Sequence, residues 1–200
     1  SKDVSIIGMR RLGVDCLPWS NECRNLVERV NSLKVWMPEL DLPDFSDNSL
    51  LDSLENWLAP YLNGFVKISQ LDKIPLMDIL SNMINWEQRK IIDKLAPSSL
   101  TVPSGSRIKI IYNAGQQPTL SVRLQEMFGC ADTPTIANGK IKILLNLLSP
   151  AQRPVQITND LKGFWTNSYQ NIKKELFERY PKHYWPDDPL NALPTKKIKP

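Results

Sequence analysis

Basic side chains alternate with apolar ones at two places in the second half of this 200-residue chain. Arg107 and Lys109 flank one isoleucine, and Lys140 and Lys142 flank another. A period of two places alternate residues on one face of a β-strand, so the four cations share a face if the two segments are neighbours in a sheet. Such a surface suits the phosphates of a nucleic acid. The solvated face of a half-buried sheet explains the same pattern equally well.

A second group of candidates lies near the C-terminus, where aromatic and basic side chains follow one another between prolines. Tyr184 and Trp185 stand close to Arg179 and Lys182. Aromatic rings beside cations are typical of proteins that bind single-stranded nucleic acid, because each base can stack on a ring. The alternative is that the rings pin the C-terminal segment to the rest of the fold. We favour this packing interpretation because large aromatic side chains are highly buried on average.

Catalytic chemistry is not indicated by the residues. Nucleotide hydrolysis needs a glycine-rich loop ending in Lys and Ser or Thr, and the only Gly-Lys pair, at 139–140, is followed by isoleucine. His183 is the single histidine and lies between prolines, so a serine-based triad is not expected. Asp187 and Asp188 are adjacent in an extended segment, where neighbouring side chains diverge. An autonomous enzyme is therefore the weakest of the functional classes considered.

Composition predicts a globular cytoplasmic protein. The chain is 42% hydrophobic, and its apolar runs are far shorter than the ~20 residues needed to span a bilayer, so no membrane partner is expected. Three cysteines, an odd number, are expected to be reduced and buried, and with one histidine they do not suggest a zinc site. A chain that begins at Ser1 rather than Met is expected to be part of a longer polypeptide.

Charge is distributed unevenly between the two halves. Residues 1–100 contain 11 basic and 14 acidic residues, whereas residues 101–200 contain 14 basic and 7 acidic residues. An anionic partner is therefore expected to bind the second half.

Hydrophobic periodicity predicts a helical array in the first half. A helix is expected to start at Ser20, Asn85 is expected to cap another in a capping box with Gln88, and Asp47 or Asn48 to cap a third. A turn is expected around Gly64. The expected helices cover residues 2–12, 20–36, 47–58, 76–84 and 85–96.

After Ser98 the period changes from 3.6 to 2, which predicts strands joined by hairpins. Turn residues at 103–105, 113–117 and 138–139 separate these strands. Arg123 and Glu126 stand where a strand meets a turn, and a buried ion pair between them is the structural alternative to a role in ligand binding. Thr158 is expected to cap residues 159–165, and Ser168 to cap a last helix that ends near residue 179, with an extended tail after it. The prediction is an α+β fold with a helical region at 1–97 and a small antiparallel sheet with its C-terminal helix and proline-rich tail at 98–200.

Several uninterrupted segments resemble the C-terminal region of the HrpB family, bacterial ATP-dependent RNA helicases of the DEAH-box type. The resemblance extends from about residue 58 to residue 195, and more loosely to Leu17-Pro18-Trp19. The segments that carry it are residues 100–107, 122–129, 147–154 and 158–161, the pairs Phe164-Trp165, Ser168-Tyr169 and Pro194-Thr195, and the runs Arg179-Tyr180-Pro181-Lys182-His183 and Trp185-Pro186-Asp187-Asp188-Pro189.

The resemblance implies an accessory domain of a 3′-to-5′ motor that acts on RNA or single-stranded DNA. The ATP and magnesium of such a motor would be bound by domains outside this chain, so no cofactor is expected here. Its expected partners are single-stranded RNA or DNA and the motor domains of the same polypeptide. Two functions follow: a module that contacts nucleic acid, or a structural domain that braces the helicase core or recruits a protein.

Overall fold

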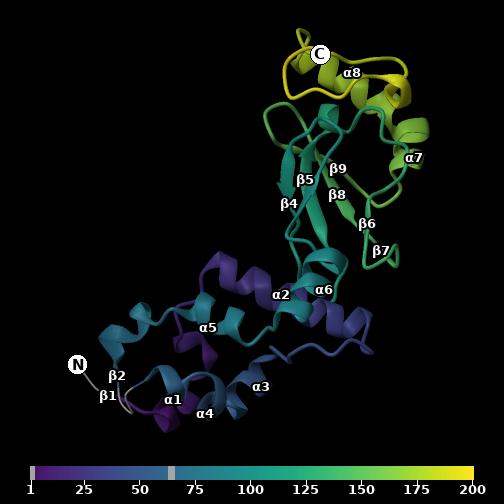
Figure 1. Ribbon diagram of the computed structural model, residues 1–200. Coiled ribbons are helices and arrows are strands. Elements are labelled where there is room, and N and C mark those ends of the chain that lie inside the picture. Colours follow the sequence, from purple (N-terminus) through teal and green to yellow (C-terminus); the bar gives the residue numbers. More distant parts are fainter. Residues whose placement is uncertain (1–2, 63–65) are drawn as a thin grey trace. The chain divides into compact units, whose positions relative to one another are not determined.

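The computed structural model describes residues 3–62 and 66–200 and divides into two compact units (Figure 1). Unit 1 contains the described residues up to 96 together with residues 113–115, and unit 2 contains residues 97–112 and 116–200. Unit 1 is mainly helical and unit 2 holds most of the strands, so the predicted α+β class is confirmed. The division of the chain into regions 1–97 and 98–200 as domains stays a prediction.

Unit 1 is built on helices whose caps are visible in the sequence. The Ser20 hydroxyl accepts from the backbone N–H of Cys23, and Asn85 and Gln88 form the predicted capping box. Leu33, Leu58 and many other apolar side chains of these helices are fully buried. The helices are α1 (Ile6–Leu12), α2 (Asn21–Trp36), α3 (Asp47–Asp52), α4 (Leu54–Trp57), α5 (Leu76–Asn82) and α6 (Trp86–Leu95).

Two helix predictions in unit 1 need correction. The helix expected over 47–58 is broken at Ser53, whose hydroxyl donates to the carbonyl of Ser49 (2.6 Å) and so competes with the helical hydrogen bonds. Its cap is Ser46 rather than Asp47 or Asn48. The helix expected over 2–12 begins only at Ile6, because β1 (Asp3–Val4) pairs with β2 (Val66–Lys67). The predicted turn around Gly64 lies outside the described residues.

Unit 2 contains three small sheets. The hairpins β3–β4 and β6–β7 are antiparallel, as predicted. The third sheet has the order β5-β8-β9, in which β8 and β9 are antiparallel but β5 and β8 are parallel. The parallel pair was not predicted, because the β6–β7 hairpin lies between β5 and β8 in the chain and serves as part of the crossover. The strands are β3 (Ser99–Thr101), β4 (Arg107–Lys109), β5 (Thr119–Arg123), β6 (Thr135–Ile136), β7 (Ile141–Lys142), β8 (Leu144–Leu148) and β9 (Pro154–Thr158).

The C-terminal helix begins earlier than predicted. Asp160, not Thr158, caps α7 (Leu161–Gly163) by accepting from the N–H of Gly163 (3.0 Å). A π-helical segment (Phe164–Ser168) connects α7 to α8 (Tyr169–Arg179), so Ser168 lies inside one continuous helical stretch and caps nothing. Ser168 cannot cap because its own backbone is helical, whereas Thr158 ends β9 and its hydroxyl accepts from the N–H of Asp160 (2.9 Å), before α7 begins.

The C-terminal tail folds back over α8 and lies at the same end of unit 2 (Figure 1). The Tyr169 hydroxyl donates to the carbonyl of Pro186 (2.7 Å), and burial raises the pKa of Tyr169 above its ordinary value. Lys173 pairs with Asp187, and this hydrogen bond lowers the carboxyl pKa of Asp187. A 3₁₀ turn (Pro189–Asn191) interrupts the tail, which is therefore not extended throughout as predicted.

Candidate nucleic-acid interface

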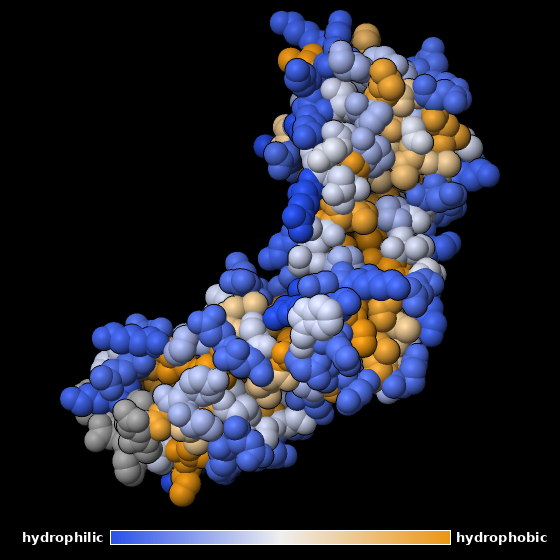
Figure 2. Space-filling model, in the orientation of Figure 1, coloured by the Kyte–Doolittle hydropathy of each residue, from blue (hydrophilic) through white to orange (hydrophobic). Residues whose placement is uncertain are grey.

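A cleft of about 430 Å³ in unit 2 collects three basic side chains from distant parts of the sequence. We call it the first cleft. The start of β4, the end of β5 and the C-terminal tail each contribute one cation, and these are Arg107, Arg123 and Lys196. The remaining polar lining comes from Ser106, Ser121, Gln152 and one acid, Glu126. Figure 2 shows hydrophilic residues along the edge of unit 2 that carries β4.

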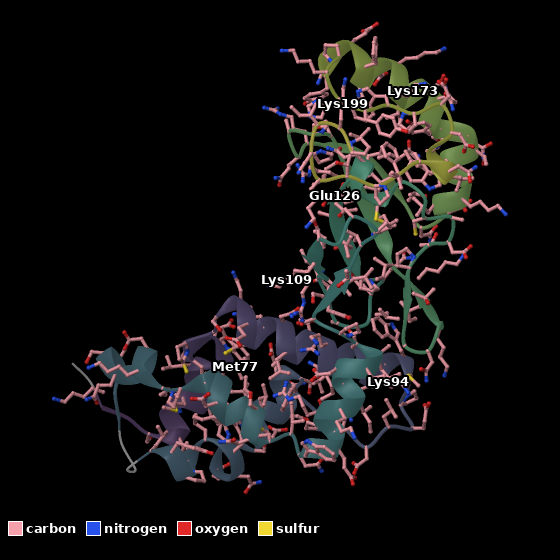
Figure 3. The ribbon with its side chains drawn as sticks, turned by 45° about the horizontal axis from the view of Figure 1, so that its top comes forward. Met77, Lys94, Lys109, Glu126, Lys173 and Lys199 are labelled. Carbon is pink, nitrogen blue, oxygen red and sulfur yellow. The ribbon has the colours of Figure 1, made fainter. Side chains whose placement is uncertain are left out.

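Glu126 is the organising residue of the first cleft, although it is only 3% exposed. A 3₁₀ turn (Leu124–Met127) after β5 directs its side chain inward, where the hydroxyls of Ser104 (2.9 Å) and Ser106 (2.5 Å) donate to it. The Nε–H of Arg123 donates to its other oxygen (3.3 Å), which forms the ion pair that was the structural alternative. Figure 3 shows Glu126 within unit 2, below the end that carries the tail. The only acid of the cleft is therefore already paired.

The cations of the first cleft keep hydrogen-bond donors that no group in the described part of the chain accepts. Arg123 uses its Nε, and Arg107 donates its Nε to the Ser99 hydroxyl (2.6 Å). The terminal nitrogens of both arginines, and the amine of Lys196, have no hydrogen-bond or ion-pair partner among the described residues. Guanidinium groups with free terminal nitrogens bind phosphate in a bidentate manner.

Lys196 is held at the cleft by the residue before it. Thr195 is 6% exposed, and its backbone N–H donates to the carbonyl of Gln125 (3.1 Å). Its hydroxyl accepts from the N–H of Lys197 (3.0 Å), which closes a tight turn around Lys196. The basic tail is thus fixed in place at its beginning rather than free along its length.

Thr195→Val is expected to loosen this turn while keeping the shape of the side chain. The free energy of unfolding should fall by about 1 kcal/mol, because the buried hydroxyl and its partners lose their hydrogen bonds. Backbone hydrogen exchange at Lys197 should accelerate, and this is the direct measurement. Unchanged exchange at Lys197 would show that the Gln125 contact alone fixes the tail.

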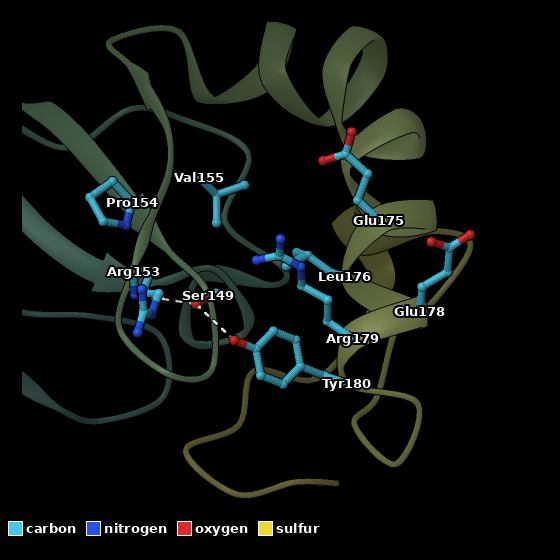
Figure 4. Close-up of a pocket in the computed structure, with 9 residues that line it drawn as sticks. All are labelled: Ser149, Arg153, Pro154, Val155, Glu175, Leu176, Glu178, Arg179 and Tyr180. Carbon is cyan, nitrogen blue, oxygen red and sulfur yellow. Dashed lines mark hydrogen bonds between the residues drawn. The ribbon is translucent and has the colours of Figure 1, made fainter.

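A second cleft, of about 450 Å³, lies between β9 and α8 (Figure 4). Arg179 points from α8 into this cleft, whereas Glu178 points away from it. The Ser149 hydroxyl accepts from the backbone N–H of Arg153 (3.2 Å) and lies 3.4 Å from the hydroxyl of Tyr180. The guanidinium groups of Arg153 and Arg179 make no ion pair with any described carboxylate.

The condition for a shared row of four strand cations, that the two hairpins are neighbours in one sheet, is not met. Arg107 and Lys109 are on β4, whereas Lys142 is on β7, and these two strands belong to separate two-stranded sheets. Lys140 lies in the turn before β7 rather than on a strand. The alternation was read correctly at each hairpin, but the sequence does not reveal which hairpins are neighbours.

The remaining lysines are exposed but not gathered with Arg107. Lys142 lines a hollow of about 250 Å³ beside Lys162, where Asp132 and Asp160 balance both charges. Lys109, Lys140 and Lys182 are exposed and line neither cleft.

The aromatic residues of the tail pack against the fold. Trp185 is only 8% exposed, and its indole N–H donates to the carbonyl of Tyr180 (2.9 Å). Tyr184 is half-buried, and its ring meets that of Phe128 edge-on at 6.0 Å. Trp185 therefore does not present a ring face to a base, and the packing interpretation describes it correctly.

Sequence reasoning missed most of the cations that the clefts collect. Arg123 was considered mainly as half of an ion pair, and Arg123, Arg153 and Lys196 were not among the candidate nucleic-acid-binding residues. They come from a strand end, a turn and the tail, where no periodic pattern marks them. The one available signal was the excess of basic residues in the second half.

Residues 3–62 and 66–200 contain no group of three or more His, Cys, Asp or Glu side chains that could bind a metal ion. Within the same ranges, no helix has the length and hydrophobicity needed to cross a bilayer. The three cysteines are free, but only Cys23 is fully buried, which corrects the expectation for Cys16 and Cys130.

Comparison with known proteins gives consistent matches along the chain. The model of a family described as "ATP-dependent helicase C-terminal" matches residues 57–189. The ATP-dependent RNA helicase HrpB of Escherichia coli (strain K12) is 44% identical over 192 residues, which are 96% of this chain and 24% of that protein.

Two solved structures are similar in fold as well. The crystal structure of the E. coli DExH-box NTPase HrpB matches with a TM-score of 0.89 at 44% identity, covering 96% of this chain and 24% of that one. The crystal structure of the Escherichia coli DEAH/RHA helicase HrpB matches with a TM-score of 0.75 at 41% identity, covering 90% and 23%. The chain thus spans about a quarter of the length of these relatives.

Proposed function

Because the chain belongs to the family of ATP-dependent helicase C-terminal regions, as its resemblance predicted, we propose that it contacts the nucleic acid on which a helicase motor acts. The observation that carries the proposal is the first cleft, where three cations keep free donors around one acid that is already paired. The relative is named as an RNA helicase, so RNA is the first ligand to test.

The proposed contribution is electrostatic positioning rather than chemistry. Arg107, Arg123 and Lys196 would each neutralise a backbone phosphate and release the counterions condensed on it. Such contacts fix the register of a strand without reading its sequence. The resemblance assigns ATP and magnesium to motor domains, and the proposed contact with a strand requires neither of them.

Titration of the whole chain with fluorescently labelled oligouridylate at several salt concentrations tests the proposal. Three phosphate contacts to a single strand predict that log K falls with log salt with a slope of about −2. Arg107→Gln and Lys196→Gln should each weaken binding several-fold and make the slope shallower by about 0.7. Lys174→Gln, which removes an exposed lysine of α8 outside both clefts, is the matched control and should leave both quantities unchanged.

Absence of binding at the lowest salt would reject a nucleic-acid contact by this chain. If Lys174→Gln weakens binding as much as Arg107→Gln does, the RNA does not bind specifically at the first cleft. In that case the affinity would reflect only the excess of 14 basic over 7 acidic residues in residues 101–200.

A docking role is the second candidate function, and unit 1 favours it. Unit 1 is acidic overall, and Trp86 (72%), Ile7 (65%) and Val35 (63%) are large hydrophobic side chains left exposed on it. If this chain only braces a helicase core, an enzyme that contains it should keep its RNA affinity after charge reversal of four residues. These are Arg107, Lys109, Lys140 and Lys142. This experiment separates the two functions.

A further inference from the structure

One short turn separates the first cleft from the second. Leu148 and Gln152 line the first cleft, whereas Ser149 and Arg153 line the second. Adjacent residues at each end of this turn, 148 and 149 and then 152 and 153, therefore line different clefts. The two clefts are neighbours in space, although their cations come from residues as far apart as 107 and 196.

The turn between the clefts is closed by its own hydrogen bonds. The N–H of Gln152 donates to the carbonyl of Ser149 (2.8 Å), and the N–H of Ser149 donates to the carbonyl of Arg153 (2.9 Å). Gln152 takes a positive φ of 62°, which the tight turn imposes on a residue other than glycine. The turn is a defined ridge with Gln152 and Arg153 exposed on it.

The second cleft, like the first, is lined by cationic side chains with donors that no described residue accepts. The guanidinium groups of Arg153 and Arg179 make no ion pair or side-chain hydrogen bond with the described residues, even though Glu175 and Glu178 also line the cleft. Arg179 points inward toward Val155 (Figure 4), so its cationic donors face the cavity rather than the solvent on the far side of α8. An anion in this cavity would be the acceptor that both arginines lack.

We propose that the second cleft binds further phosphates of the strand held by the first cleft, so that a single strand bends over the ridge of residues 149–153. This inference rests on the proposed function and adds to it a second binding site and the path of the strand between the two clefts. Duplex DNA is stiff over about 150 base pairs and does not follow so tight a ridge, whereas a flexible single strand does. Unit 2 therefore selects single strands by shape, with phosphates in both clefts.

The length of the bound strand distinguishes one occupied cleft from two. We would compare labelled oligouridylates of about 3 and about 12 nucleotides, because basic grooves typically occupy about 4–16 nucleotides of a single strand. For the longer strand, the double variant Arg153→Gln/Arg179→Gln should weaken binding about tenfold and make the salt slope shallower by about 1.4. For the shorter strand, which needs only the first cleft, the same variant should change affinity less than about threefold.

Three comparisons complete the experiment. Arg179→Lys keeps the charge and should recover part of the affinity for the longer strand, and Lys94→Gln on α6 is the control for loss of an exposed lysine. A duplex of the same length should bind less tightly than the single strand and should not respond to Arg153→Gln/Arg179→Gln. Urea unfolding midpoints of all variants establish that they are folded.

The possible outcomes distinguish failure of this inference from failure of the proposed function. If no oligonucleotide binds the unmodified chain, the proposed function fails. In a second outcome, Arg107→Gln weakens binding, but Arg153→Gln/Arg179→Gln has no larger effect on affinity than the control Lys94→Gln at either strand length. The proposed function then stands, and the second cleft does not bind the strand. If duplex and single strand bind alike, selection of single strands is wrong.

Discussion

Replacing Glu126 with alanine is expected to lower the free energy of unfolding by about 3 kcal/mol, because it breaks a buried ion pair from one side. The Ser104 and Ser106 hydroxyls and the Nε–H of Arg123 would lose their common acceptor in a site that is only 3% exposed. Arg123 itself is partly exposed and can recover water, which places the expected loss at the lower end for such pairs.

Urea unfolding followed by circular dichroism measures this loss. Glu178→Ala is the matched control, because Glu178 is an exposed acid of α8 without an ion pair in the described residues, and its removal should change stability by less than about 0.5 kcal/mol. Equal midpoints for the two variants would mean that the serine and arginine contacts of Glu126 contribute nothing net.

A substitution at Glu126 can show whether RNA binding depends more on the net charge beside the first cleft or on the orientation of Arg123. Glu126→Gln removes a negative charge beside the first cleft, so electrostatics alone predicts tighter binding. A glutamine cannot accept from both serines and from Arg123 as the carboxylate does, so Arg123 should lose its fixed orientation. We expect the second effect to prevail and affinity to fall several-fold. A rise in affinity would show that Arg123 needs no fixed position.

The sequence predicted local structure well where one segment contains its own signal. Asn85 and Gln88 form a capping box as expected, because a cap depends on residues three positions apart. The hairpin around residues 138–139 was found for the same reason, although four residues, 137–140, connect its strands rather than the two expected.

The candidate site was harder to predict because it depends on contacts between distant segments. Pairing of β5 with β8 brings the end of β5 beside the turn after β8, and the tail then adds Lys196. No local pattern encodes these neighbours, so alternation at 107–109 and at 140–142 was extended wrongly to a common sheet. Arg107 and Arg179 were identified, but the sequence did not place them in two clefts that share one ridge.

The packing interpretation had the aromatic residues of the tail pin it to the fold, yet the centre of that packing is Phe128, which lies far from the tail in the sequence. Phe128 is fully buried, and its ring lies 5.8 Å from that of Trp165, 6.2 Å from Tyr169 and 6.0 Å from Tyr184. It thus connects the segment after β5, the π-helical segment and the tail in one cluster.

Phe128→Ala is therefore expected to lower the free energy of unfolding by about 4 kcal/mol, the largest effect of any substitution proposed for this chain. The lost area, the cavity and three edge or tilted ring contacts all contribute. Phe177→Ala is the control, because Phe177 on α8 is 55% exposed and its removal should cost less than about 1 kcal/mol.

The same variant connects core packing to the proposed interface. Because Tyr184 rests on Phe128 and the Thr195 turn follows it in the tail, loss of the ring should release Lys196 from the first cleft. RNA affinity of the folded Phe128→Ala chain should then fall to that of Lys196→Gln, and adding Lys196→Gln should weaken binding no further. Additive losses in the double variant would instead mean that the tail keeps Lys196 in place without its aromatic support.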